Sequence, residues 1–116
     1  MKIVEKGWGE ERIWVSNDLY CSKKLVFYKK NNKFSMHFHK DKTETWLVES
    51  GKFNLLYINT DNGKIKNKEL NKGDIWHNDP LLPHQLIALE NNSIINEVST
   101  KDNKDDNYRV IPGDSQ

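Results

Sequence analysis

The sequence predicts an all-β protein, built as a sandwich or barrel of antiparallel strands. Two observations favour this class. Short runs of β-branched and aromatic residues recur along the chain, and turn-forming residues separate them. No window of about a dozen residues keeps a 3.6-residue apolar period, so helix should be confined to a turn or two.

About eight to ten short strands are expected. The runs with strand character are, in chain order, residues 12–15, 20–28, 33–39, 45–49, 52–58, 64–70, 74–77, 84–89 and 93–99. The segments between them are rich in Asn, Gly and Asp, which accept positive φ or bond their own backbone. The clearest hairpin signal is Asn62-Gly63.

The chain of 116 residues fits one domain with a modest core, which we expect to span residues 1–116. Residues 100–116 are polar and form a C-terminal tail that either packs on the barrel or frays; Tyr108, Arg109 and Val110 favour packing. No apolar run approaches the roughly 20 residues of a membrane span. Charges interrupt the N-terminal segment where a signal peptide needs an apolar core, so a cytoplasmic protein is expected.

The formal charge of +1, with Lys and Asp/Glu interspersed, argues against a nucleic-acid partner. Cys21 is the only cysteine, so no intramolecular disulfide and no thiolate-rich zinc site can form. We expect Cys21 to be a packing residue.

The segment FSMHFHKDKTETWLVESG carries the strongest functional signal. Alternate residues of a strand share a face, so His37 and His39 should point to one place. Glu44 follows, and His84 is the natural third histidine. A single strand histidine is usually a partly exposed residue without a chemical role, but the four residues together favour a metal site. They would leave one or two open positions on an Fe, Mn, Ni, Co or Zn ion, where a small-molecule substrate could chelate.

These residues resemble the first motif of the cupin superfamily: two histidines one residue apart, a glutamate after four residues and a glycine, Gly51, after six more. The second cupin motif is present in altered form. Gly73-Asp74 opens it, Leu81 stands at its usual inner glycine, and His84 carries its histidine. The resemblance implies a cupin-type antiparallel β-barrel, a double-stranded β-helix or jelly roll, with His37, His39, Glu44 and His84 as metal ligands. His77 precedes the turn and is expected at the rim.

Within the superfamily, the chain resembles small single-domain relatives of type II mannose-6-phosphate isomerase. The matching elements are Gly7-Trp8-Gly9, HFHKDKTETW, and a closing acidic pair at Asp105-Asp106 followed by Arg109. Two positions depart from that group: Lys42 stands where arginine is usual, and Thr45 where histidine is usual. Because arginine grips phosphate as a rigid fork and lysine acts as a point charge, the particular sugar phosphate does not carry over.

Three functions remain open. The leading hypothesis is a metal-dependent aldose–ketose isomerase for a sugar or sugar phosphate, in which Glu97 moves the proton and Lys42 and Arg109 orient an anionic end. This role needs the strand at 93–99 to turn Ile95, Glu97 and Ser99 inward. The alternatives are an Fe(II)-dependent small-molecule dioxygenase and a non-catalytic cupin that binds a sugar or small acid.

The remaining apolar residues are expected to build the interior and the subunit contacts. The core and cavity wall should contain Trp46, Val48, Phe53, Leu55, Tyr57 and Leu86. Trp8, Trp14 and Tyr28 could lie at a rim or subunit contact. We expect a homodimer, in which the strand with Ile13 and Val15 extends a neighbour's sheet.

Overall fold

The computed structural model describes residues 1–114 and contains eleven β-strands and no helix in that range. The strands are β1 (Lys2–Lys6), β2 (Gly9–Ser16), β3 (Tyr20–Phe27), β4 (Met36–Phe38), β5 (Glu44–Ser50), β6 (Lys52–Ile58), β7 (Ile65–Asn71), β8 (Ile75–Asn78), β9 (His84–Ala88), β10 (Ser93–Thr100) and β11 (Tyr108–Ile111). No helix that could cross a membrane occurs within these 114 positions.

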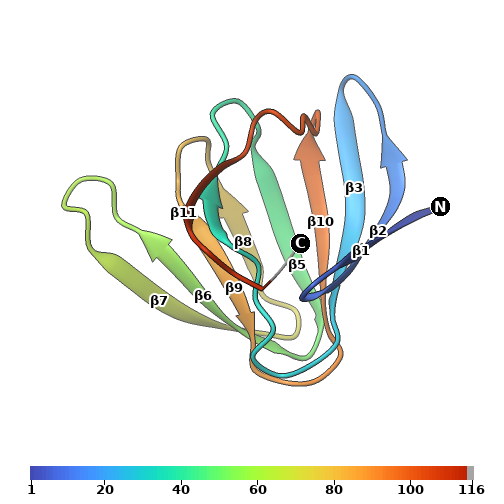
Figure 1. The fold of residues 1–116 in the computed structure, drawn as a ribbon, viewed down its shortest axis with the longest axis horizontal. Coiled ribbons are helices and arrows are strands. Elements are labelled where there is room, and N and C mark those ends of the chain that lie inside the picture. The colour runs from blue at the N-terminus through green and yellow to red at the C-terminus, as the bar shows by residue number, and fades with distance from the viewer. Residues whose placement is uncertain (115–116) are drawn as a thin grey trace.

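The strands form two antiparallel sheets that face each other (Figure 1). The six-stranded sheet has the order β1-β2-β3-β10-β5-β8, and the five-stranded sheet has the order β11-β4-β9-β6-β7. Strands adjacent in sequence often lie in different sheets, as β4 and β5 do, so the chain winds around the space between the sheets. This is the jelly roll of a cupin barrel, as the sequence predicts.

All nine predicted strands are present, and two further strands were not predicted. β1 carries charges at positions 2, 5 and 6 and lies at the edge of its sheet, paired with β2. All four residues of β11 are exposed, so no apolar alternation marks it. β11 pairs with β4, so the C-terminal tail packs on the barrel through this strand. Positions 115–116 of the predicted tail lie outside the described residues.

The core fills the space between the sheets with large side chains from both. Its buried members are Trp8, Leu25, Phe27, Phe34, Trp46, Val48, Phe53, Leu55, Leu70, Leu86, Ala88 and Ile95. Tyr57 packs against this cluster from a half-buried position, and Cys21 is buried elsewhere in the barrel. The prediction for Trp8 was wrong: its ring stacks on Phe27 with centroids 4.6 Å apart, because the β1–β2 turn folds it inward.

The turn between β5 and β6 depends on glycine. Gly51 has φ of 75°, and a Cβ there would collide with the side chain of Ser93. The glycine that closes the first histidine motif is therefore needed for backbone conformation and for close packing against β10.

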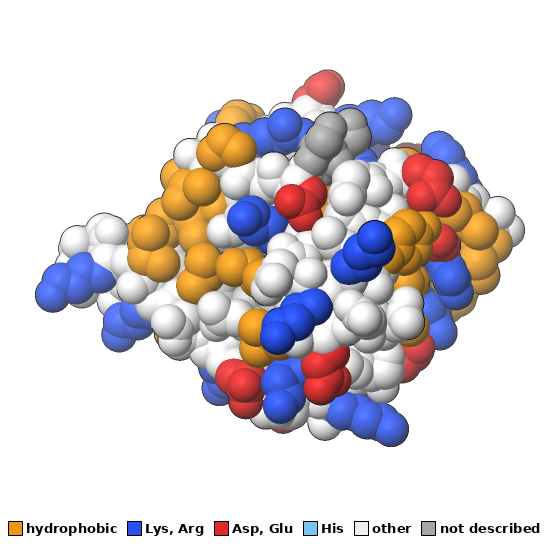
Figure 2. Space-filling view, turned by 60° about the horizontal axis from the view of Figure 1, so that its bottom comes forward, with side chains coloured by type: hydrophobic (Ala, Val, Ile, Leu, Met, Phe, Trp, Pro, Cys, Tyr) orange, Lys and Arg blue, Asp and Glu red, His pale blue; other side chains and the backbone are white. Residues whose placement is uncertain are grey.

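The structure corrects the reason given for a dimer. β2, which carries Ile13 and Val15, pairs with β1 on one side and β3 on the other, so it has no free edge for a neighbour. The edge of this sheet is β1. A homodimer stays a prediction. Figure 2 shows basic and acidic side chains interspersed over one face of the molecule, as the near-zero net charge leads one to expect.

Candidate metal centre

Three histidines meet between the sheets. His37 lies on β4 and faces His84 of β9 in the strand register, and His39 follows β4 on the same face as His37. One ring nitrogen from each residue lies within 4.8 Å of the other two. This arrangement brings together the three histidines that the sequence predicted.

Each histidine is oriented by a backbone carbonyl. The Nδ1 atom of His37 contacts the carbonyl oxygen of Ser35 at 2.7 Å, and that of His84 contacts Leu82 at 2.9 Å. His39 Nδ1 contacts the carbonyl of Asp106 at 2.6 Å. A carbonyl only accepts hydrogen bonds, so Nδ1 carries the proton and Nε2 keeps its lone pair. This is the arrangement usual for metal-binding histidines.

Glu44 completes the cluster from the opposite sheet. Its Oε1 atom lies 3.3 Å from Nε2 of His39 and 3.3 Å from Nε2 of His84. Yet Glu44 Oε1 and His84 Nε2 are both buried without a hydrogen bond of acceptable geometry among the described residues. Leaving such atoms unpaired costs free energy unless something else binds them.

A divalent metal ion fits these atoms. Two ligand atoms that each lie about 2.1 Å from one ion are roughly 3.0 to 3.4 Å apart. Glu44 Oε1 lies 3.3 Å from Nε2 of His39 and of His84, in this range, and the three histidine nitrogens lie within 4.8 Å of one another. Burial, followed by the neighbouring His84 and His39, lowers the pKa of His37 to about 3, so this ligand is neutral near pH 7. Neutral imidazoles and one carboxylate suit the transition metals named above. The three histidines could therefore hold such an ion, with Glu44 as a fourth ligand.

Glu97 lies directly beside this cluster. Residues 95, 97 and 99 of β10 are buried and 96, 98 and 100 are more exposed, so Glu97 faces inward, as the isomerase hypothesis requires. The indole N–H of Trp46 donates to Glu97 Oε1 at 2.9 Å and to Glu44 Oε2 at 3.2 Å. A single donor thus links the two carboxylates.

The protonation of Glu97 is strongly perturbed. Burial and the negative charge of Glu44 raise the pKa of Glu97 to about 7, against the opposing effect of two lysines. Lys23 and Lys42 each place Nζ 3.7 Å from Glu97 Oε2. That oxygen has no hydrogen bond within the described part of the chain. Glu97 can therefore gain or lose a proton near neutral pH, which suits proton transfer.

Lys42 is buried and already paired. Its Nζ atom lies 3.1 Å from Asp102 Oδ1 as well as near Glu97. Burial opposes the charge of Lys42, but Glu97 and Glu44 outweigh it and raise its pKa. Lys42 was predicted to bind the substrate. In the structure, the positive charge of its ammonium group is already neutralised by Glu97 and Asp102. Arg109, on β11 opposite His37, is exposed and lines the same cavity.

Lys23 was missed by the sequence reasoning. It is 7% exposed, and its Nζ atom contacts Glu11 at 2.5 Å and Asp102 at 3.5 Å. A signal was available: on β3 the alternate positions 21, 23, 25 and 27 are all buried, and position 23 is the one lysine among apolar residues. Lysine at an inward strand position requires a carboxylate partner.

Asp106 organises the loop that carries His39. Its carboxylate accepts the backbone N–H groups of Lys40 at 2.6 Å and of Asp41 and Lys42 at 3.0 Å each. Burial acts to raise the pKa of Asp106, but these three donors outweigh it and lower that pKa. The acidic pair of the closing motif thus has a structural role that its sequence did not reveal.

The second motif keeps its geometry despite the missing glycine. Leu81 has φ of 71°, the left-handed conformation for which glycine is usual, and its N–H donates to the carbonyl of His39 at 2.7 Å. His77 is exposed and contacts Thr45 at 2.7 Å and Asp79 at 3.2 Å, away from the three histidines. It is exposed and is not a lining residue of the cavity, so its predicted place at the rim stays a prediction.

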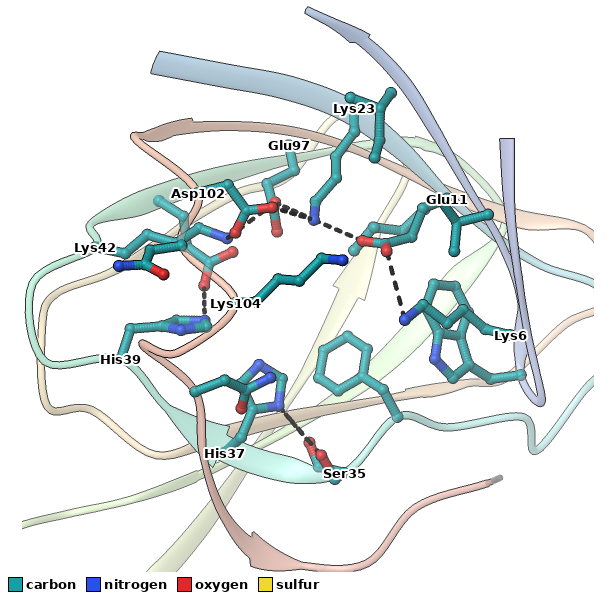
Figure 3. A pocket seen from close by; sticks show the side chains of 18 of the residues that line it. Lys6, Glu11, Lys23, Ser35, His37, His39, Lys42, Glu97, Asp102 and Lys104 are labelled. Atoms are coloured by element: carbon teal, nitrogen blue, oxygen red, sulfur yellow. Dashed lines mark hydrogen bonds and ion pairs between the residues drawn. The ribbon is translucent and has the colours of Figure 1, made fainter. Parts of the chain in front are cut away.

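A cavity of about 530 Å³ opens onto this centre. His37, His39, Glu44 and Glu97 line its inner part, and Phe34 and Trp46 supply apolar wall. Figure 3 shows the histidines on one side of the cavity and Glu97, Lys23 and Lys42 on the other. The volume suits a small molecule of the size of a sugar or an organic acid.

Comparison with known proteins identifies the fold. No protein-family model and no curated protein sequence matches the chain. Among solved structures, KdgF from Halomonas sp. has a TM-score of 0.71 and 18% identity over 83% of this chain and 81% of that one. Capsular polysaccharide assembling protein CapF from Staphylococcus aureus has a TM-score of 0.79 and 16% identity over 94% of this chain and 32% of that one. Oxalate decarboxylase from Bacillus subtilis has a TM-score of 0.75 and 21% identity over 92% and 29%.

These similarities establish the cupin fold. The chain spans about a third of CapF and of oxalate decarboxylase, and most of KdgF. At these identities the reaction does not transfer, because one fold serves many chemistries.

Proposed function

We propose that this protein is a metal-dependent aldose–ketose isomerase that acts on a sugar or sugar phosphate. One observation carries the proposal: the Trp46 N–H joins Glu97 to Glu44, so a carboxyl group with a pKa of about 7 stands next to the candidate metal ligands. Isomerisation needs a Lewis acid and a proton carrier at adjacent atoms of one substrate, and this pair of groups offers both.

His37, His39, Glu44 and His84 would hold the ion. A divalent cation supplies stabilisation of the negative charge that develops on the substrate's adjacent oxygens. The backbone carbonyls that bond the three Nδ1 atoms keep every Nε2 directed to one place without further reorganisation.

Glu97 carries the proton. As a carboxylate it removes the proton from the carbon next to the carbonyl, and as a carboxylic acid it returns that proton to the neighbouring carbon. A pKa of about 7 makes both states accessible near neutral pH. Trp46 holds one oxygen of Glu97, and the other oxygen, which has no hydrogen bond among the described residues, would carry the proton.

The test is proton exchange from solvent. Metal-loaded protein is incubated in deuterated buffer with a panel of hexoses, pentoses and their phosphates, and deuterium at C1 and C2 is followed by NMR. We expect exchange with at least one substrate, and its loss in Glu97→Gln but not in Glu49→Gln. Glu49 is the matched control because it lies in the same sheet and pairs with Lys24 at the surface.

The panel also separates the rival functions. Oxygen consumption that depends on iron, without exchange, would favour a dioxygenase. Saturable sugar binding without exchange in either the wild type or Glu97→Gln would favour a binding protein. Either result overturns the isomerase.

A further inference from the structure

Asn78 is a buried polar residue whose role the metal centre leaves unexplained. It ends β8 and is 1% exposed. Its side chain points into the barrel, because positions 76 and 78 of this strand are more buried than the exposed positions 75 and 77. A buried amide needs partners for both its oxygen and its nitrogen, so the partners of Asn78 indicate its role.

Only one half of this amide has a partner among residues 1–114. The indole N–H of Trp76 donates to Asn78 Oδ1 at 2.7 Å. An indole N–H can only donate, so the atom that it contacts is the amide oxygen and the other atom is the NH₂ nitrogen. That nitrogen, Nδ2, is buried and has no acceptor in this part of the chain. Such a donor costs free energy unless another group accepts its hydrogen bond.

Asn78 lies directly opposite Glu44 in the pairing of β8 with β5. Side chains at opposed positions share a face of the sheet, with their Cβ atoms about 4.5–5.5 Å apart. Glu44 is also buried, and its Oε1 atom has no hydrogen bond of acceptable geometry within the described range. An unpaired donor and an unpaired acceptor therefore occupy adjacent positions inside the barrel, although no hydrogen bond joins them.

Glu44 needs a second donor to hold its carboxylate. The hydrogen bond that it accepts from Trp46 is 3.2 Å long, and the same N–H donates to Glu97 at 2.9 Å. The shorter distance favours Glu97, so Trp46 alone orients Glu44 weakly. Carboxylates that bind metal ions are normally held by hydrogen bonds of their own. An amide suits this position because it donates without adding a charge beside the histidines.

We propose that Asn78 is a positioning residue for the metal ligand Glu44: in the metal-bound protein, its Nδ2 group donates to the Glu44 carboxylate. The bond satisfies the unpaired donor only when Glu44 acts as a ligand, so it favours the metal-bound form. Asn78 does not line the cavity, so it acts through Glu44 and not on a substrate. This inference rests on the metal centre of the proposed function and does not require the isomerase reaction.

The first measurement is the zinc affinity of Asn78→Leu, by competition with a coloured chelator. Leucine has the branched shape of asparagine without its polar atoms. We expect the affinity to fall by roughly 10 to 100-fold, the usual effect of removing the partner of a metal ligand. Asn96→Leu is the matched control, because Asn96 lies on β10 of the same sheet and donates to Glu49 at 3.1 Å on the outer face. It should bind zinc as the wild type does.

A double-mutant cycle tests whether Asn78 acts through Glu44. Zinc affinity is measured for Asn78→Leu, for Glu44→Ala and for the double variant, all of which keep the three histidines. Once Glu44 has been replaced, Asn78→Leu should not lower the affinity further, because its acceptor is gone. If the two losses multiply in the double variant, Asn78 acts independently of Glu44 and the inference is wrong.

NMR separates this role from a purely structural one. In ¹⁵N-labelled protein, the side-chain NH₂ signals of Asn78, assigned by their absence from Asn78→Leu, are followed as zinc is added. A proton that gains an acceptor moves to lower field, so we expect one of the two signals to move while those of Asn96 stay in place. A role confined to pairing with Trp76 would leave these signals fixed and lower the urea midpoint of metal-free Asn78→Leu below that of Asn96→Leu.

The outcomes separate this inference from the isomerase proposal, because no sugar is present. Wild-type zinc affinity in Asn78→Leu, or fixed Asn78 signals, overturns the inference whether or not sugar exchange is observed. The expected effects on zinc binding without sugar exchange keep the inference and remove the isomerase. Absence of zinc binding by the wild type overturns both. If Asn78→Leu does not fold, Asn78→Ala takes its place, and if Glu44→Ala binds too little zinc to measure, the Asn78 signals and the Asn96 control decide.

Discussion

The two sheets contribute different chemistry to the same cavity. The five-stranded sheet and the segments that follow its strands supply three imidazoles, and a backbone carbonyl orients each of them. The six-stranded sheet supplies Glu44, Glu97 and Lys23, which are held by Trp46 and by one another. Removing one side chain should therefore have local effects on the first sheet and shared effects on the second.

This difference predicts which residues affect metal binding and which affect proton transfer. Backbone atoms keep the histidines in position, so metal binding should tolerate changes in the charged network. The carboxylates set the pKa values of their neighbours, so proton transfer should respond to every member of that network. Substitutions in each sheet test this contrast.

Glu97→Gln should abolish proton transfer and keep the metal. We expect the exchange rate to fall by roughly 10² to 10⁴-fold, the usual contribution of a general acid–base. Metal content, measured by mass spectrometry of the purified protein, should equal that of the wild type. Loss of metal in this variant would mean that metal binding by the histidines depends on the carboxylate network.

Lys23→Met should destabilise the fold without disturbing the histidines. The change removes one of the two lysines beside buried Glu97 and the nearer of the two beside half-buried Glu11. Breaking a buried pair costs about 3–5 kcal/mol, and the remaining lysines should keep the loss at or below the lower end of that range. Lys24→Met is the matched control, because Lys24 is the next residue of β3 and forms an exposed pair with Glu49 at 2.8 Å. That pair is worth about 0–1 kcal/mol. Urea unfolding of metal-free protein compares the two, and equal free energies of unfolding would contradict the network.

Asp106→Asn should loosen the loop that carries His39. The amide cannot accept all three N–H groups, so we expect a loss of about 1–3 kcal/mol in stability. Metal affinity should fall by roughly 10 to 100-fold, as is typical when the support of a ligand is removed. Asp105→Asn, at the exposed neighbouring position, should leave both unchanged. Competition with a coloured chelator measures the affinity.

Leu81→Gly should stabilise the protein slightly. Leu81 has φ of 71° and is 56% exposed, so glycine relieves backbone strain and removes little buried surface. The gain should be about 1 kcal/mol. Leu19→Gly, at a position 77% exposed and without positive φ, should destabilise instead. A melting temperature for Leu81→Gly below that of the wild type would show that the side chain has a role in packing.

Periodicity and motif spacing predicted most of the architecture. Most of the nine predicted strands were found because burial of one face leaves an apolar alternation in the sequence, whereas β7, exposed at all but one position, was found from the turns that bound it. β1 and β11 were not found, since they lie at sheet edges and expose most of their side chains. His37 and His39 were predicted because strand geometry places them on one face, and His84 because it stands at the histidine position of the second cupin motif.

The electrostatic network was only partly predictable. Strand alternation left both faces open for residues 93–99, because Ile94 and Val98 form an apolar set opposite to Ile95, so the inward orientation of Glu97 became clear only in the structure. On β3, the same alternation would have found Lys23. The partners in the tail could not be found this way. Asp102 and Asp106 lie in a segment without regular structure, where position depends on long-range contacts to Lys42 and to the loop after β4. Trp8 was assigned to a rim because nothing local shows that its turn folds inward.

The central claim is that His37 and His84, from different strands, bind one metal ion together. The most direct measurement is the metal content of His37→Ala/His84→Ala against that of His77→Ala, which changes an exposed histidine outside the centre. Both proteins are dialysed against the same divalent ions and measured by mass spectrometry. We predict one ion per chain in the wild type and in His77→Ala, and none in the double variant. An unchanged ion content in the double variant would contradict the claim.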